Sequence, residues 1–394
     1  MKNNNHFPTP LAGNNHHIFL NESSKKLVLL FSAMNMKAGQ FNYKQAGRTL
    51  DENVIFLNDT SNQWYQEGIE SLGDTFKTTI ETIKQWIKVL NIEEVYTIGT
   101  SMGGYAAIHY GIHLNAKILS FATTTVLNTP HCESKSKIKP STQIICNDLR
   151  TIVNDSQEDI FLICGESDPL DVFSASLLKD YKKVKLISLK GVDHYVPTAL
   201  ARDHALFSIF NTFVKNGEPD ISKLTNKGLI FESKDTAKLL YNAYKFQKNG
   251  MYVSAELEAI KVLEKYPYSE SALFILGKSL LKQNKYKDAA YYFSMAYSMA
   301  PDIAEYAFFY SHAIRLDGAK IQSIYLLDNL LKKFPNYSRA YYAKGIILAS
   351  EKKFKYAIQN INLAIKLDPY NKSYKKGLEK IKKKAKSYEI KKNI

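Results

Sequence analysis

Two patterns of apolar and polar positions divide the chain. Up to about residue 215, short apolar runs alternate with segments in which apolar residues recur every three or four positions. The runs predict buried strands and the segments predict amphipathic helices, whereas beyond residue 236 only the helical spacing remains. We therefore predict an α/β domain over residues 1–215, a linker over 216–235 and an all-helical domain over 236–394.

Most of the apolar runs are expected to form one mostly parallel sheet. Strands that are apolar along nearly their whole length and alternate with helices are typical of a sheet covered on both faces. A shorter run at 17–23 is expected to add an antiparallel edge strand, and the segment 71–92 is predicted to be a helix. The six main runs are residues 26–33, 53–59, 94–100, 116–126, 159–165 and 183–188.

The C-terminal part repeats with a period of 34 residues. Prolines, which end helices, and small residues, which allow helices to cross closely, keep this period. The period and its marker positions resemble tetratricopeptide repeats, four of them over about residues 236–371, followed by a basic capping helix. The markers are Pro267, Pro301, Pro335 and Pro369, with Ala243, Gly277, Ser311, Gly345, Ala255, Ala289, Ser323 and Ala357.

The positive charge of the chain is confined to this C-terminal part. The formal net charge is +15, from 53 Lys and Arg and 38 Asp and Glu. Residues 1–215 hold 21 of each kind, which leaves 32 basic and 17 acidic residues beyond them. We expect an anionic polysaccharide or an acidic protein to bind the repeats, unless the lysines serve only solubility. Nucleic acid is not expected, because the tyrosines follow the repeat spacing of packing residues and no single-strand-binding motif is present.

Other features bear on location. No run of 18 apolar residues is present, so no membrane span is expected, and the first ten residues lack the apolar centre of a secretory signal. The three cysteines show neither metal-ligand spacing nor an even disulfide set, so we expect no metal site and a reducing compartment. The sequence therefore predicts a cytoplasmic protein.

The stretch YTIGTSMGGYAA, residues 96–107, carries the strongest chemical signal. Ser101 stands between Gly99 and Gly103, directly after a predicted strand and before a helix-forming segment. A serine at such a turn adopts a strained backbone conformation, and flanking glycines remove side chains that would clash there. The following helix directs its free N–H groups to the same place. The pattern predicts a nucleophile, and a tight turn without chemistry is the alternative.

Residues 16–215 resemble an α/β-hydrolase domain. In that family an acid and then a histidine follow the nucleophile along the chain, each just beyond a later strand. The resemblance implies that Asp168 is the acid and that His194 is the histidine. Glu166 and Asp171 lie in the same stretch as Asp168 and are the alternatives for the acid.

The chemistry of acyl transfer requires these residue types. His194 would remove the proton of Ser101 and later return one to a leaving group. Asp168 would hold the imidazole in the correct tautomer and stabilise its charged form. The other histidines on predicted helices of this domain are expected to be packing or surface residues: His109, His113 and His204.

The resemblance also implies an oxyanion hole made of backbone N–H groups. One donor is expected at Met102, the residue after the nucleophile, and the other near Ala33 or Met34, in the loop after the first long apolar run. Trp64 and Tyr65 follow the second such run in a polar loop. They are candidates for a substrate pocket, with ordinary packing as the alternative.

The acceptor of the acyl group decides the reaction. The loops FSAMN and WYQEG and the elbow TSMGGY are similar to those of bacterial serine-triad proteins that O-acetylate surface polysaccharides. This resemblance implies O-acetylation of a capsule-type polysaccharide with acetyl-CoA as acyl donor and no bound cofactor. A carbohydrate esterase or thioesterase is the alternative when water is the acceptor. A further alternative is an interaction scaffold whose hydrolase domain is secondary.

Overall fold

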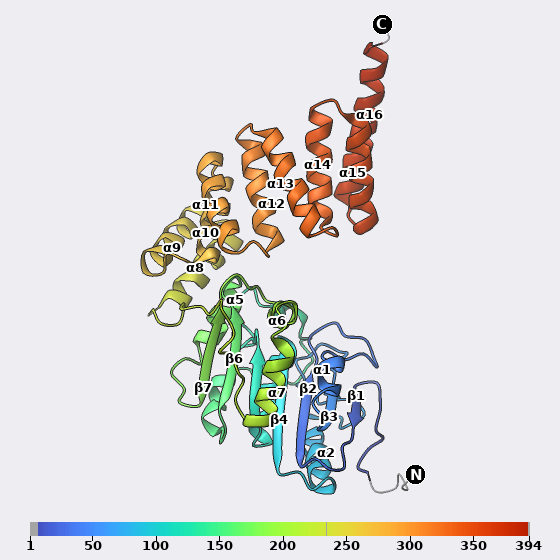
Figure 1. Ribbon diagram of the computed structural model, residues 1–394, viewed down its shortest axis with the longest axis vertical. Helices are drawn as coiled ribbons and strands as arrows, with labels where there is room; N and C mark the ends of the chain where they lie inside the picture. The colour runs from blue at the N-terminus through green and yellow to red at the C-terminus, as the bar shows by residue number, and fades with distance from the viewer. Residues whose placement is uncertain (1–6, 234, 393–394) are drawn as a thin grey trace. The chain divides into compact units, whose positions relative to one another are not determined.

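A computed structural model describes residues 7–233 and 235–392 of the chain. The chain forms two compact units, of which the first ends at Lys245 and the second begins at Phe246 (Figure 1). The first is an α/β unit and the second consists of helices. The predicted succession of an α/β domain and a helical domain is confirmed.

The first unit is built on a seven-stranded sheet with the strand order β1-β3-β2-β4-β5-β6-β7. Strand β1 pairs antiparallel with β3, and every other neighbouring pair is parallel. The predicted strands, including the antiparallel edge, are all present. Their bounds are β1 His16–Phe19, β2 Lys26–Phe31, β3 Asn53–Leu57, β4 Glu94–Thr100, β5 Lys117–Phe121, β6 Ile160–Gly165 and β7 Val184–Leu189.

Helices cover both faces of this sheet. Helices α1 (Lys44–Arg48), α6 (Val196–Arg202) and α7 (Leu206–Asn216) share one apolar core with residues of the strands. Helix α3 (Met102–His113) packs across β2, β4 and β5, and α2 (Phe76–Val89) lies beside it through stacked aromatic rings. Burial on both faces explains why the strands are apolar along nearly their whole length.

The segment predicted as a linker packs in part on the first unit. Asn226 and Gly228 exchange backbone hydrogen bonds with the end of β7, and the Ile230 N–H donates to the Glu166 carboxylate at 3.0 Å. Ile230 is fully buried. The first unit therefore ends later than the predicted boundary at residue 215, because residues 226–230 complete the edge of the sheet.

The helical repeats show the predicted period, and their first helix begins within the first compact unit, before Phe246. The first helices of the four helix pairs begin at residues 236, 270, 304 and 338, and the second helices at 252, 286, 320 and 354. The small marker residues are buried between helices, and a Cβ on Gly277 would lie 2.8 Å from the Phe293 ring. The helices are α8 Thr236–Lys248, α9 Tyr252–Lys265, α10 Glu270–Lys282, α11 Tyr286–Met299, α12 Ala304–Leu316, α13 Lys320–Lys333, α14 Ser338–Ser350 and α15 Phe354–Leu367.

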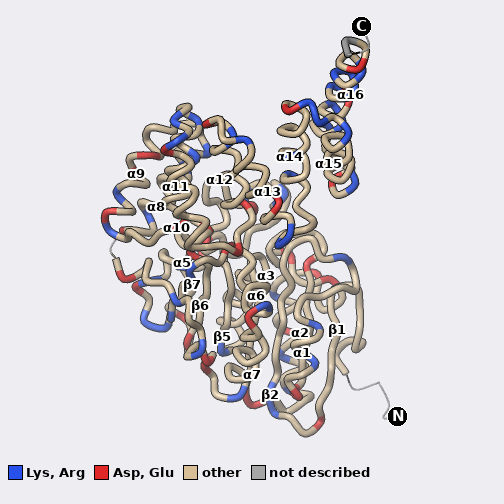
Figure 2. Tube along the Cα trace, turned by 45° about the horizontal axis from the view of Figure 1, so that its top comes forward, with Lys and Arg blue, Asp and Glu red and all other residues tan. Residues whose placement is uncertain are grey.

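A final helix, α16 (Lys372–Lys392), packs against α15 and α14. Its sequence contains ten lysines, and Figure 2 marks basic positions along it in blue. Across residues 7–233 and 235–392, no helix has the length and apolar character needed to cross a membrane.

Candidate active site

Ser101 occupies a sharp turn between β4 and α3. Its backbone has φ 56° and ψ −119°, in the left-handed range of φ that side chains rarely adopt. A Cβ on Gly99 would lie 2.0 Å from the Gly103 carbonyl oxygen, and one on Gly103 would lie 2.3 Å from the Phe31 carbonyl oxygen. Only glycine fits at both positions, which is the physical reason for the G-x-S-x-G pattern.

His194 connects this serine to a carboxylate. His194 lies in the loop between β7 and α6, and its Nε2 is 2.9 Å from Ser101 Oγ. Its Nδ1 is 2.8 Å from one carboxylate oxygen of Asp171 and 3.1 Å from the other. Asp171 is buried in the first turn of α5 (Pro169–Ser176). The three side chains form one hydrogen-bonded chain from carboxylate to hydroxyl.

Asp168 has a different position from the one predicted. Its side chain caps α5, and Oδ1 accepts hydrogen bonds from the backbone N–H groups of Leu170 at 2.8 Å and Asp171 at 3.0 Å. The prediction that Asp168 pairs with His194 is wrong, because an aspartate before a proline at a helix start uses its oxygens for the cap. The side chain of Asp171, one turn further along α5, does not cap the helix and can bind His194.

Glu166, the other candidate acid, is also engaged elsewhere. It is buried, and its Oε1 accepts hydrogen bonds from Ser188 Oγ at 2.7 Å and from the Ile230 N–H at 3.0 Å. Its carboxylate thus ties the segment after α7 to the edge of the sheet.

The two aspartates shift the protonation of their neighbours. The Asp171 carboxylate raises the pKa of His194 above its ordinary value, more than burial lowers it. Burial, with the nearby Asp171 charge, raises the pKa of Asp168 to about 6. The arrangement therefore favours a charged imidazole, which is the state that forms when a histidine takes a proton from serine.

Within residues 7–233 and 235–392, these side chains also form a group whose spacing could accommodate a metal ion. One oxygen or nitrogen from each of Asp168, Asp171 and His194 lies within 4.8 Å of the others. Both nitrogens of His194 already make hydrogen bonds, one to Asp171 and one to Ser101. The observed geometry is that of a proton-transfer chain.

The predicted oxyanion donors differ in their availability. Met102 is the first residue of α3, where a backbone N–H has no acceptor within the helix. The Ala33 N–H, in contrast, donates to the Asn42 side chain at 2.7 Å. The prediction that the Ala33 N–H is an oxyanion donor is therefore wrong, because this N–H already has an acceptor. Of the two residues considered for that loop, this leaves the N–H of Met34.

Trp64 and Tyr65 do not line an open pocket. Both are buried, with 2% and 0% of their surface exposed. The Tyr65 hydroxyl donates to the Ser32 carbonyl at 2.9 Å, and its N–H donates to Asp59 at 2.9 Å. The prediction that they form a substrate pocket is wrong, since both side chains are buried and the Tyr65 hydroxyl is bound to the loop that follows β2.

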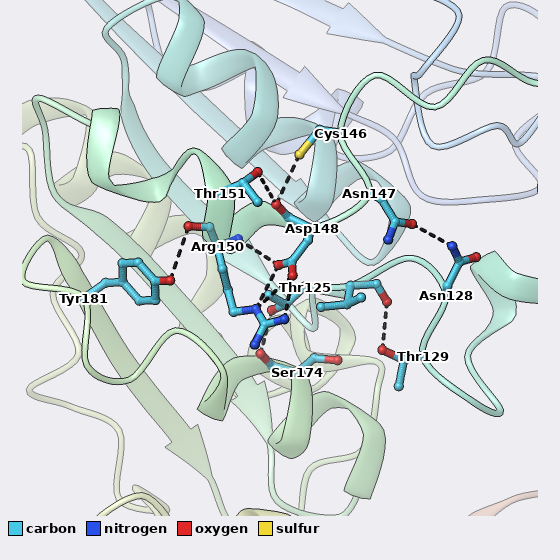
Figure 3. A network of polar contacts seen from close by, with 11 residues as sticks. Thr125, Asn128, Thr129, Cys146, Asn147, Asp148, Arg150, Thr151, Ser174 and Tyr181 are labelled. Carbon is cyan, nitrogen blue, oxygen red and sulfur yellow. Dashed lines mark hydrogen bonds and ion pairs between the residues drawn. The ribbon is translucent and has the colours of Figure 1, made fainter.

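The segment between β5 and β6 borders the site, and sequence reasoning assigned it no role. Figure 3 shows its polar contacts, among them an ion pair between Asp148 and Arg150. Thr125 Oγ1 donates to the Ser174 carbonyl of α5 at 2.5 Å, so the segment is attached to the helix that carries Asp171. Its helix α4 (Glu133–Lys137) begins with an acid that acts electrostatically on His194.

Comparisons with known proteins concern the repeats. Residues 244–303 match the tetratricopeptide repeat family model. No curated protein sequence matches the chain.

Similar solved structures include a MamA protein, with 20% identity over 40% of this chain and 87% of that one, at a TM-score of 0.36. A tetratricopeptide repeat protein from Parabacteroides merdae shares 20% identity over 39% of this chain and 62% of that one, at a TM-score of 0.35. An O-GlcNAc transferase mutant from Thermobaculum terrenum shares 22% identity over 34% of this chain and 27% of that one, at 0.32. At these scores the likenesses add nothing to the repeat assignment.

Proposed function

We propose that the first unit catalyses serine-dependent acyl transfer, with Ser101 as nucleophile, His194 as general base and Asp171 as the acid that orients it. The observation that carries this proposal is the 2.9 Å contact between Ser101 Oγ and His194 Nε2 on a strained strand-to-helix turn. A nucleophile, a base within hydrogen-bond reach and a third group that orients the base are what covalent acyl transfer requires.

The reaction follows from these contacts. As Ser101 Oγ attacks the acyl carbonyl carbon, its proton passes to His194 Nε2, and Asp171 stabilises the resulting imidazolium. The carbonyl oxygen becomes an oxyanion beside the Met102 N–H. The carbon–leaving-group bond then breaks, the leaving group takes the proton from His194, and an acyl ester of Ser101 remains. An acceptor hydroxyl next loses its proton to His194 and attacks this ester. The bond between the acyl carbon and Ser101 Oγ then breaks, and His194 returns the proton to Ser101 Oγ, which restores the free enzyme.

The acceptor that we propose is a sugar hydroxyl of a bacterial surface polysaccharide, with acetyl-CoA as donor. The support is the resemblance of the loop after β2 and of the elbow to polysaccharide O-acetyltransferases of this fold. With water as acceptor, the same residues would make a carbohydrate esterase or thioesterase. The acyl ester must be shielded from water if transfer is to compete with hydrolysis.

A fluorophosphonate probe tests the nucleophile directly. We expect it to label the wild type at Ser101 and to leave Ser101→Ala unlabelled. Incubation with acetyl-CoA and candidate polysaccharides then separates the acceptors, because CoA release should rise several-fold when the right hydroxyl is present. Fast hydrolysis of acetyl esters that no polysaccharide alters would replace the transferase with an esterase.

A second candidate function is an interaction scaffold, favoured by the match of residues 244–303 to tetratricopeptide repeats. Repeat arrays present extended binding surfaces, and most do no chemistry. An unlabelled wild type that still binds a protein partner through the helical unit would support this function over the first.

A further inference from the structure

The first helices of consecutive repeats bring cations over aromatic rings. Lys278, on α10, places its Nζ 5.2 Å from the ring centroid of Phe274 and 5.1 Å from that of Phe309. Arg339, on α14, places its Cζ 4.4 Å from the centroid of Phe308 and 5.5 Å from that of Phe309. The Phe309 ring of α12 is therefore shared by two positive charges from two different helices.

A third cation adds to this cluster. Arg315, on α12, has its Nη2 3.2 Å from Nδ1 of His312, whose ring stacks on Phe308. Burial lowers the pKa of His312 to about 4, and the neighbouring Arg315, Arg339 and Lys282 lower it too. The imidazole is thus neutral near pH 7 and can accept the guanidinium hydrogen bond.

The cluster has little negative charge of its own. Its carboxylate is Glu305, with Oε1 3.8 Å from Arg339 Nη1 and both side chains nearly half exposed. Exposed pairs of this kind contribute little. Over residues 7–233 and 235–392, no carboxylate forms an ion pair with Lys278, although its ammonium is partly buried and burial lowers its pKa. Most of the positive charge of the three cations is therefore not neutralised by a protein carboxylate. An anion that binds them displaces only one weak ion pair and gains charged hydrogen bonds.

The chemistry of the rings bears on which anion fits. Phe274 and Phe308 are buried, with 9% and 8% exposed, and the cations stand over them. Phe309 is partly exposed, and Lys278 and Arg339 both stand over its ring. Sugars and nucleic-acid bases bind on open aromatic faces, and here burial and the cations occupy these faces. Carboxylates need only charged donors, and a planar guanidinium binds them with two parallel hydrogen bonds.

We propose that Lys278, Arg315 and Arg339 form a binding site for the carboxylates of an acidic peptide segment of a protein partner. The match of this region to tetratricopeptide repeats agrees with a protein ligand, and recognition of acidic motifs by clustered arginines is a recurrent mode of peptide binding. The site lies within the helical unit and is independent of the proposed chemistry at Ser101.

Binding of a fluorescein-labelled octaglutamate peptide to the full chain tests the site. We expect the dissociation constant, measured by anisotropy at 0.1 M salt, to rise about tenfold or more in Lys278→Gln/Arg339→Gln. The matched control is Lys380→Gln/Lys383→Gln, which removes the same charge from exposed positions on α16. The control should change the constant less than about threefold, because exposed charges are screened.

The outcomes are distinct. Equal weakening by both variants would show a diffuse electrostatic effect and overturn the site. Tighter binding of a hyaluronan octasaccharide than of octaglutamate, lost in the first variant alone, would replace the peptide with an anionic glycan. If the first variant loses its circular dichroism signal, hydrogen exchange of the wild type decides instead. Octaglutamate should then protect amides of α10 and α12, and unchanged exchange there would refute the proposal.

Discussion

Replacing each of the two aspartates in turn by asparagine, which removes the carboxylate charge, separates the roles of Asp168 and Asp171. In Asp171→Asn, an amide replaces the carboxylate that lies 2.8 Å from His194 Nδ1. An amide that donates to Nδ1 favours the tautomer with a proton on Nε2, which faces Ser101 and can no longer accept its proton. We expect kcat/KM to fall by about 10³- to 10⁴-fold, which corresponds to about 4 to 5.5 kcal/mol of transition-state stabilisation.

The matched change, Asp168→Asn, should be mild. Asparagine is as good a cap as aspartate, so its side-chain oxygen can keep the hydrogen bonds from the N–H groups of Leu170 and Asp171. The lost charge is one of several that act on His194, and Asp171 acts on it more strongly. We expect kcat/KM to change by less than about tenfold.

The assay is hydrolysis of an activated acetyl ester, with the rate of fluorophosphonate labelling of Ser101 as a second measure. Both should fall steeply in Asp171→Asn and little in Asp168→Asn. Circular dichroism spectra that match the wild type would exclude misfolding as the cause. A severe loss in Asp168→Asn with a nearly normal Asp171→Asn would refute the assignment and restore the acid expected from sequence.

Four further outcomes follow from the structure. Because the pKa of His194 is raised and the base must be neutral, the acid limb of kcat/KM should lie above pH 6.5, the ordinary histidine value. The raised pKa of Asp168 means that the folded state binds its proton more tightly, so wild-type stability should fall as pH rises from about 4 through 6. Urea unfolding can be followed by the fluorescence of the two tryptophans, which both lie in the first unit. The stability of Asp168→Asn relative to the wild type should therefore be higher at pH 8 than at pH 4. Gly103→Ala places a Cβ 2.3 Å from a backbone oxygen of β2 and should cost about 3 kcal/mol in the same assay. A chain ending at Lys215 should fail to label with the probe, whereas one ending at Lys245 should label, because only the second keeps the segment paired with β7.

The repeats could be predicted from sequence because their packing is local. Each proline ends a helix, and each small residue meets a helix nearby in the chain, as Gly277 meets Phe293. The register of such contacts is therefore written directly in the residue spacing. The strands and the elbow of Ser101 were accessible for the same reason, since a G-x-S-x-G turn between a strand and a helix is a local feature.

The acid was missed although a local signal existed. Aspartate followed by proline is typical of the start of a helix, with the aspartate as cap and the proline at the first helical position. That reading assigns Asp168 to the cap of α5 and leaves Asp171 as the acid that can face another element. Only the partner of Asp171, which lies 23 residues further along the chain, required the structure.

The oxyanion loop and the aromatic pair were missed for lack of any local signal. The Ala33 N–H donates to the Asn42 side chain, and Tyr65 is buried, with its hydroxyl bound to the Ser32 carbonyl, which lies after a different strand. Neither contact follows from spacing or composition. Such positions depend on how loops from separate strands meet, and that is decided by the packing of the whole sheet.

The positive charge of the helical unit consists of two physically different parts. The α16 lysines between residues 372 and 386 are exposed, so their field falls off within about 10 Å at 0.1 M salt and mainly speeds the approach of an anion. Lys278 and Arg315 are partly buried, and with Arg339 they stand beside aromatic rings, where screening is weaker and geometry is defined. Raising the salt should therefore slow association more than it speeds dissociation of octaglutamate, because field and site act on different steps. Net charge therefore describes only how fast an anion associates. Selectivity between anions has to come from Lys278, Arg315 and Arg339, which the fold holds in place.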